Sequence, residues 1–491
     1  MAKEVKFKSE YIHSLIGIVL MFIGFFIPPF ATLTDVGVRV LFIFIGQVYL
    51  WSTVGSIWPS LLGLVFLGMS GFYTSMSAAL QNGFGNNTVI LILFSMILFG
   101  GLVECGVANY ISRFFLTRKI CNGRPYLFMF IFMYGIFILS TLTNTFATIV
   151  LSWSIVYTIL TDLGYSKDDK FSKFFVFASF VAAILGQSSI PFRGSEVALY
   201  VAFENTFGVG INNLMYMILA FTMAAFLIAG LCIMCKLVYR CDVSKLKQLD
   251  VEEMDKRDPL PPLNNSQKFY FVVCMLFILM LLIPTVLDKS IPVVAFLNSL
   301  NNYGITIVFV AVCCILRIDG KPVLNFKAVA SKHVDWGVIL LVAVALMLSS
   351  ALTSDATGIK PIIIGILNPL LGERSIWATG CILVIFSFVL TNFANNFVCG
   401  SVMMPIWGAF ALEMGISSAA APAIASITIL CLYLAFVTPA ASPLAAMLYG
   451  NREWLTPGDV LKMAIPFSLY VLFIYCTVGY LLANLLFGLI V

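Results

Sequence analysis

Long apolar runs recur along the whole of this chain, and each run of about 18 residues or more can cross a bilayer as a helix. Of the 491 residues, 61% are hydrophobic and only 10% are charged, and the mean hydropathy is +1.03. A globular surface needs roughly a quarter of its residues charged, so this composition excludes a soluble domain. We therefore expect an all-α polytopic membrane protein.

The runs predict about eleven transmembrane helices and one polar surface segment, at residues 75–87. The expected spans are residues 12–30, 36–51, 54–72, 88–116, 174–207, 214–239, 269–286, 303–316, a span that begins at Trp336, 419–449 and 460–489. No small-residue cleavage site follows the N-terminal lysines, so we expect the first span to stay as a signal anchor. Basic residues concentrate in connections that this order places on one side. They predict a cytoplasmic N-terminus and no nucleic-acid partner.

Two polar clusters interrupt the apolar pattern, at residues 140–148 (STLTNTFAT) and, about 248 positions later, at 390–396 (LTNFANN). Lipid cannot hydrogen-bond a polar side chain, so each cluster must face protein, water or a bound solute. We interpret residues 126–160 and 376–412 as two re-entrant helical hairpins with these clusters at their tips. Hydrogen bonding between helices would explain one cluster alone, whereas the matched pair favours a single site built twice.

Each hairpin is followed by an apolar span with a polar break in its middle. The first break, at 187–196, contains Ile190-Pro191, and the second, at 438–443, starts with Thr438-Pro439. Corresponding positions of the two halves are 248 or 249 residues apart. Each half has an odd number of crossings, so the halves are expected to lie in opposite orientations. Inverted repeats with broken helices that meet near the middle of the bilayer are typical of transporters.

Tips and breaks leave backbone groups unpaired at membrane depth, which is costly unless protein, water or a solute satisfies them. Carbonyl, Thr and Asn oxygens suit a hard cation such as Na⁺, and half-helix N-termini suit an anion. Arg193 and Glu196 are the charged residues close to a break. They predict either a buried ion pair held for structure, or a direct role in which Arg193 binds an oxyanion and Glu196 orients it or exchanges a proton.

Enzyme motifs are missing from the sequence. It contains no phosphate-binding loop, no His-Glu-x-x-His, no Gly-x-Ser-x-Gly and only two histidines. The 12 cysteines lack metal-type spacing and are expected to fill helix interfaces. We therefore do not expect an enzyme.

The tips and breaks together resemble the divalent anion–sodium symporter family, within the ion transporter superfamily. That family carries Ser-Asn-Thr on each of two re-entrant hairpins. Thr143-Asn144-Thr145 resembles the first copy, and Thr391-Asn392 resembles the start of the second. Thr438-Pro439 resembles the second Thr-Pro break of the family, and Ile190-Pro191 resembles the first. The resemblance covers nearly the whole chain in order and spacing.

The resemblance implies a homodimer in the plasma or inner membrane, in which a scaffold holds an elevator-type transport domain coupled to Na⁺. It divides the chain into scaffold helices (1–125), a first hairpin and broken helix (126–239), a cytoplasmic linker (240–268), a second scaffold part (269–370), and a second hairpin and broken helix (371–491). As sodium ligands it implies Thr143, Asn144, Ser189, Thr391, Asn392 and the carbonyl of Val437. The resemblance and the polar character of the tips and breaks together give the substrate-binding candidates, which are Thr143, Asn144, Thr145, Arg193, Thr391, Asn392, Asn395, Thr438 and Pro439.

Several residues depart from the family pattern. Phe393 replaces a small or hydroxyl residue, Asn395 and Asn396 stand where hydroxyls are common, and Arg193 stands where Asn is frequent. These departures speak against a standard C4-dicarboxylate and suit either a different anion or the loss of one sodium site.

We therefore expect a secondary active transporter that couples Na⁺ to the symport of a small anion, with di- or tricarboxylates favoured. One alternative is an anion exchanger or a proton-coupled carrier that uses Glu196. An ion channel built from the same re-entrant loops is an alternative of another class. A membrane enzyme is disfavoured by the missing catalytic residues.

Overall fold

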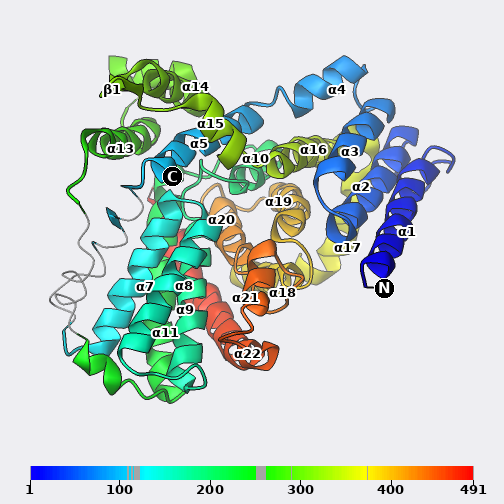
Figure 1. Cartoon of the computed structure of the whole chain (residues 1–491). Helices are drawn as coiled ribbons and strands as arrows, with labels where there is room; N and C mark the ends of the chain where they lie inside the picture. The colour runs from blue at the N-terminus through cyan, green and yellow to red at the C-terminus, as the bar shows by residue number, and fades with distance from the viewer. Residues whose placement is uncertain are drawn as a thin grey trace.

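The computed structural model describes residues 2–107, 110–111, 114, 122–249, 261–288, 290–372 and 374–489. In these ranges the chain is helical apart from its connections and one β-hairpin of two-residue strands (Figure 1). The all-α prediction is confirmed. The end of the expected 88–116 span and positions 250–260 of the linker lie outside the described residues.

The elements follow the order of two similar halves. Those of the first half are α1 (Ala2–Ile23), α2 (Asp35–Thr53), α3 (Ile57–Met69), α4 (Met76–Gly83), α5 (Asn87–Glu104), α7 (Pro125–Leu142), α8 (Thr145–Asp162), α9 (Lys170–Gln187), α10 (Glu196–Phe207), α11 (Asn213–Leu237) and η2 (Lys245–Gln248). Those of the second half are α13 (Asn265–Val286), α14 (Pro292–Ile315), β1 (Arg317–Ile318), β2 (Lys321–Pro322), α15 (Phe326–His333), α16 (Trp336–Thr353), η3 (Asp355–Thr357), α17 (Ile359–Leu371), α18 (Ile376–Thr391), α19 (Asn396–Glu413), α20 (Ala420–Leu432), α21 (Pro443–Gly450), α22 (Pro457–Ile474), η4 (Tyr475–Gly479) and α23 (Tyr480–Gly488).

The repeat seen in the sequence is also a repeat of structure. Helices α5 and α16 have the same length, and short helices, α4 and α15, precede them at corresponding places. Each short helix packs across the repeat, since α4 lies against α16 and α15 lies against α5. The two halves are therefore interlocked.

Both hairpins and both broken helices form where the sequence predicts them. Helices α7 and α8 pack against α9, and α18 and α19 pack against α20, so each hairpin lies on the broken helix of its own half. The first break spans 188–195, as predicted. The second begins at Tyr433, earlier than the predicted 438. Helix α20 stops there because the N–H groups of Phe436 and Val437 donate to the side chain of Asn392 instead of continuing the helix.

Three segments differ from the sequence prediction. The surface segment 75–87 contains a helix, α4, whose N-terminus is capped by the Ser75 hydroxyl. Helix α14 begins at Pro292 and not at 303, because a bend at Asn301 (φ 54°) joins two helical pieces and the first carries polar residues. Helix α17, between η3 and the second hairpin, has no counterpart among the predicted spans.

Ten helices of the described residues are long and apolar enough to cross a membrane, or eleven if the bent pair α17 and α18 counts as one span. The chain is thus a multi-pass membrane protein. Helices α7 and α8 each pass this test alone, so their re-entrant insertion stays a prediction.

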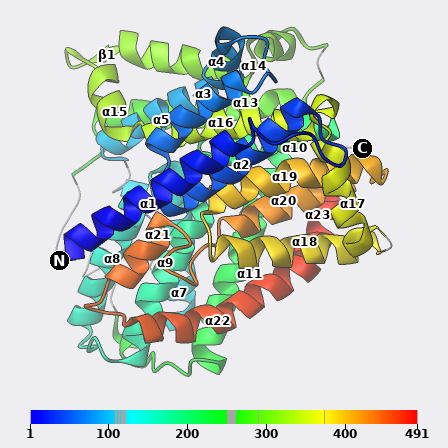
Figure 2. The ribbon, with the colours of Figure 1, turned by 90° about the vertical axis from the view of Figure 1, so that its right-hand side faces the viewer.

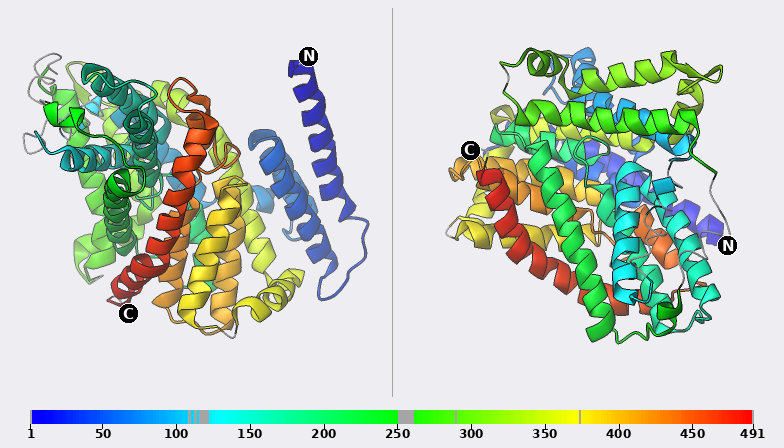
Figure 3. Two further views of the ribbon diagram at one scale, coloured as in Figure 1. Left: turned by 90° about the horizontal axis from the view of Figure 1, so that it is seen from below. Right: turned by 90° about the vertical axis from the view of Figure 1, so that its left-hand side faces the viewer.

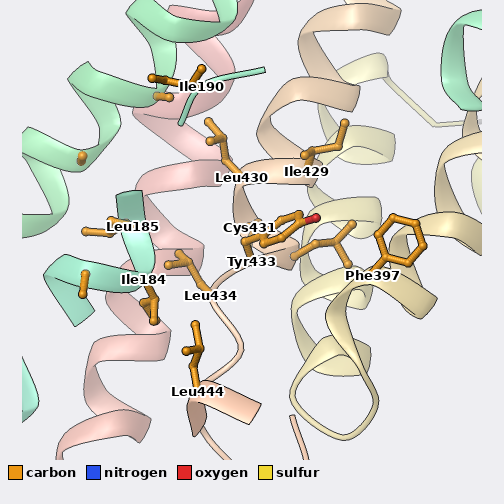
Figure 4. Close-up of a cluster of buried hydrophobic side chains, with 14 of the residues drawn as sticks. Ile184, Leu185, Ile190, Phe397, Ile429, Leu430, Cys431, Tyr433, Leu434 and Leu444 are labelled. Carbon is orange, nitrogen blue, oxygen red and sulfur yellow. The ribbon is translucent and has the colours of Figure 1, made fainter. Parts of the chain in front are cut away.

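The broken helices occupy the interior, and the first helices of each half lie outside. Helix α1 stands at one edge against α2, and α13 and α14 form the opposite edge (Figures 2 and 3). Apolar side chains such as Val272, Val293 and Phe296 are exposed on these outer helices, as lipid-facing side chains would be. Around the breaks, buried side chains of α9 and α20, including Ile184, Leu185 and Leu430, pack together (Figure 4).

Candidate functional site

A cavity of about 490 Å³ lies where both hairpin tips, the first break and the start of α21 meet the 55–56 turn, α5 and the start of α16. Its polar lining includes Thr143, Asn144, Thr145, Gln187, Arg193, Ser195, Glu196, His333, Asp335, Asn395, Asn396 and Ser442. The two polar clusters of the sequence are therefore brought together at one place.

The first tip is a tight turn of two residues between α7 and α8. Asn144 is the N-cap of α8, and its side-chain oxygen accepts hydrogen bonds from Phe146 N at 2.9 Å and Ala147 N at 3.3 Å. The Thr143 hydroxyl donates to Leu139 O at 2.7 Å and lies 2.8 Å from the Thr148 hydroxyl. Both side chains are thus bonded within their own hairpin.

Arg193 connects the first break to this tip. Its Nη1 donates to the carbonyl of Ser140, at 2.6 Å, and to that of Thr141, both in the last turn of α7. Gly186 allows the end of α9 to pack closely against the end of α7, because a Cβ there would lie 2.6 Å from Phe137 O. The guanidinium carbon also lies 5.9 Å from the ring centre of Phe99 on α5.

Glu196 is 1% exposed, at the N-terminus of α10, and its carboxylate accepts a hydrogen bond from Gly194 N at 2.9 Å. No ion pair joins it to Arg193 among the residues that the structure describes. Each group hydrogen-bonds to backbone and the two make no direct ion pair, so a structural role for the buried Arg193–Glu196 pair stays a prediction. The neighbouring Ser195 hydroxyl lies 2.8 Å from that of Tyr433, which links the first break to the second.

At the second tip the connection to the break is made by Asn392, which is 2% exposed. Its side-chain oxygen accepts from Phe436 N at 2.9 Å and from Val437 N at 2.8 Å. Its side-chain nitrogen donates to Phe388 O at 2.8 Å and to Leu434 O at 3.4 Å. Thr438 donates in return to the backbone carbonyl of Asn392, and the Thr391 hydroxyl donates to Leu432 O at 2.8 Å.

The turn at the second tip, 392–395, is longer than the turn at the first. Asn395 caps α19 through bonds of 3.0 Å to Phe397 N and 3.3 Å to Val398 N, almost the geometry of Asn144 on α8. By its structural role Asn144 therefore corresponds to Asn395. Asn392, with which the sequence aligns Asn144, lies at the end of the preceding helix.

The second tip offers uncharged oxygens of the type that a hard cation prefers, on Thr391, Asn392 and the Val437 carbonyl. Each of them is hydrogen-bonded in this structure, and Val437 O accepts from the Tyr449 hydroxyl. At the first tip, the Ser189 hydroxyl donates to its own helix at Leu185 O, 2.7 Å away, and Arg193 occupies two carbonyls. At the first tip, a cationic side chain therefore already bonds to backbone oxygens at the end of α7.

The structure distributes the candidate residues over two layers. Thr143, Asn144, Thr145, Arg193 and Asn395 line the cavity. Thr391, Asn392 and Thr438 lie behind the second tip in the contact between hairpin and break, the Ser189 hydroxyl bonds within its own helix, and Pro439 is exposed. Phe393, which departs from the family pattern, is 69% exposed.

Sequence reasoning missed several lining residues, namely Gln187, Ser195, His333, Asp335, Asn396 and Ser442, as parts of the cavity. Gln187, Ser195 and Ser442 are polar residues at helix breaks, so the breaks themselves were the available signal. His333 ends α15 and Asp335 caps the N-terminus of α16, and nothing in the sequence marks them as cavity residues.

A cavity where two hairpin tips and a helix break meet, in a multi-pass helical protein, is typical of a membrane transporter. The sequence profile of the citrate transporter family, CitMHS, matches residues 39–430, so the chain belongs to this family. This match confirms the resemblance to divalent anion transporters of the ion transporter superfamily.

Two further proteins are similar to this chain. An uncharacterized transporter of Haemophilus influenzae is 24% identical over 172 residues, which make up 35% of this chain and 36% of that relative. The YdaH transporter of Alcanivorax borkumensis, a solved structure, matches with a TM-score of 0.59 at 14% identity, over 84% of this chain and 87% of that one. This second likeness concerns the fold alone.

Proposed function

We propose that the protein is a secondary active transporter that carries a small anion, with di- and tricarboxylates favoured, together with Na⁺. The observation that carries the proposal is the convergence of both hairpin tips on one cavity, to which they contribute polar side chains. Membership of the citrate transporter family supports a carboxylate substrate.

The cavity offers the chemistry that an anion needs. The first turns of α8, α19 and α21 begin at its wall, and helix N-termini carry partial positive charge. Thr143, Thr145 and Asn395 add neutral hydrogen-bonding groups around the same space. In this proposal they bind the carboxylates, while Na⁺ is bound behind the second tip by Thr391, Asn392 and the Val437 carbonyl. An ion there would join the tip to the break.

The position of the cavity supports an elevator-type mechanism. One wall comes from the hairpins and broken helices, and the other from α5 and the start of α16. We propose that the first group moves against the second as a transport domain. We also propose that two copies assemble through their scaffold helices, in the plasma or inner membrane with the N-terminus in the cytoplasm.

Transport by purified protein in liposomes tests this proposal. Uptake of labelled citrate or succinate is expected to require an inward Na⁺ gradient, and a choline gradient is the matched control. Saturable uptake without an open-pore current is expected of a carrier and not of a channel. Sodium-independent uptake of every anion tried would reject the coupling to Na⁺.

Glu196 favours a second candidate, an exchanger or a proton-coupled carrier. It is a buried carboxyl group at the wall of the cavity and has no ion-pair partner among the described residues. In this case Glu196→Gln would abolish uptake driven by a pH gradient and retain exchange of labelled for unlabelled anion. Dependence on Na⁺ with no effect of a pH gradient would reject this candidate.

A further inference from the structure

We propose that the substrate is an amphiphilic anion, a carboxylate that carries a bulky apolar body such as an aryl or branched alkyl group. The inference rests on the proposed function and specifies the substrate class of the same cavity. In this proposal the carboxylates bind at the hairpin tips, and the apolar body lies against α5 and α16.

The first observation is that the cavity has two unlike walls. The hairpin tips contribute mainly polar side chains, those of residues 143–145 and 395–396. From α5 and α16, by contrast, every residue that lines the cavity is apolar or glycine, and these residues are Met96, Phe99, Gly100, Val103, Gly337, Val338 and Leu341. A small anion made only of charged and polar groups would have nothing to bind on this second wall.

The second observation is that the lining residues of α5 form one stripe of the helix. They recur three, four and seven positions after Met96, so they lie on the same face over two turns. Met96 and Val103 are only partly buried, although 61% of the residues of α5 are buried. Contact of this apolar surface with water is unfavourable, so a ligand group that covers the stripe gains affinity.

The third observation is that three polar groups beside this wall are already bonded within the protein. The indole N–H of Trp51 donates to the Ser60 hydroxyl at 2.9 Å, so its ring presents apolar surface. Nε2 of His333 lies 2.8 Å from the carboxylate of Glu104, and Asp335 Oδ1 accepts from the backbone at the start of α16 at 2.9 Å. A further carboxylate of the substrate on this side would also be repelled by Asp335.

The size of the cavity agrees with a ligand that carries such a body. Its volume of about 490 Å³ lies within the range of roughly 300–1,000 Å³ found for pockets that enclose drug-sized ligands. Those pockets are lined mostly by apolar and aromatic side chains, with a few polar groups that fix the orientation of the ligand. Here the α5 and α16 wall supplies the apolar part, and the tips supply the polar groups.

Binding of a matched pair of dicarboxylates to the purified protein tests the proposal. Benzylsuccinate and succinate share two carboxylates, and only benzylsuccinate has an apolar body. Benzylsuccinate is expected to bind at least about tenfold more tightly, because its ring is buried on the α5 and α16 wall. Melting temperatures measured over a range of ligand concentrations give both affinities. Benzyl alcohol, which has the ring without carboxylates, is expected to give no stabilisation. Equal affinities for the two dicarboxylates, or no stabilisation by benzylsuccinate, would overturn the proposal.

Neighbouring leucines of α16 provide matched variants. Leu341 lines the cavity and Leu340 of the same described helix lies outside its lining, although each is 7% exposed. Leu341→Gln is expected to lower the preference for benzylsuccinate over succinate by about fivefold, and Leu340→Gln to leave it unchanged. Leu341→Met, which stays apolar, is expected to retain the preference. A general loss of stability does not change this ratio of affinities, so an equal fall in both glutamine variants would overturn the proposal.

The result also separates this inference from the proposed function. If succinate is taken up with Na⁺ and benzylsuccinate binds no better than succinate, sodium symport stands and the amphiphilic substrate fails. If benzylsuccinate binds more tightly in a manner that depends on Leu341, and its uptake needs no Na⁺, the substrate class stands and the coupling to Na⁺ fails.

Discussion

The two hairpin tips have the same position in the two halves, but different side chains satisfy the hydrogen bonds of their backbone groups. At the second tip, a longer turn and the neutral side chain of Asn392 satisfy the groups between hairpin and break. At the first tip, a turn of two residues is completed by the charged side chain of Arg193. The comparison teaches that the repeat places the two tips alike, and that the length of each turn decides which side chain bonds to the backbone there.

The largest expected effect is at Asn392, because its side-chain amide bonds to the backbone of both the hairpin and the break. Asn392→Ala leaves the buried N–H groups of Phe436 and Val437 without acceptors. We expect a loss of about 3 kcal/mol in the free energy of unfolding and at least about a tenfold loss of uptake. Thermal melting of the purified protein and liposome uptake measure the two effects.

Asn144→Ala is the matched control for that substitution. Asn144 is exposed and caps one helix, so its loss is expected to cost about 1 kcal/mol. Equal losses for the two asparagines would show that the tips are alike in spite of their different bonds.

The contrast between the tips also shows where sequence reasoning ends. Polar residues inside apolar runs are visible in any sequence, so both hairpins, both breaks and the order of the repeat were predicted. The partners of Arg193 are backbone carbonyls 52 and 53 positions away, and backbone groups leave no mark on a sequence. Proximity in the chain suggested Glu196 as the partner, and the structure assigns Glu196 to its own helix terminus.

The same reasoning explains the alignment of the asparagines. A constant spacing of 248 residues pairs Asn144 with Asn392 and predicts the same structural role for both residues. The longer second turn shifts the cap to Asn395, and a change of turn length within a polar cluster is invisible when the cluster is read as residue types.

A smaller effect is expected at Tyr449, whose hydroxyl donates to the Val437 carbonyl. In the proposed sodium site the hydroxyl competes with the ion for this oxygen. Tyr449→Phe is expected to lower the sodium concentration for half-maximal uptake by about fivefold, since a single hydrogen bond contributes about 1 kcal/mol. Tyr470→Phe is the control, because its hydroxyl donates to Phe226 O at 2.9 Å, outside the proposed site. A similar shift in both variants, or none in Tyr449→Phe, would remove Val437 from the sodium ligands.

The smallest expected effect concerns Phe99, the aromatic ring on α5 that faces Arg193. Phe99→Leu keeps most of the apolar volume and removes the attraction between ring and guanidinium, which contributes about 0.5–2 kcal/mol. Phe99 also lies 5.9 Å from the ring of Phe277, so the single variant loses packing as well. A double-mutant cycle with Arg193→Ala isolates the coupling between the two side chains. Melting temperatures that show a coupling of about 0.5 kcal/mol or more are expected. Strictly additive losses would mean that α5 does not hold the guanidinium, and that the carbonyls of α7 position it alone.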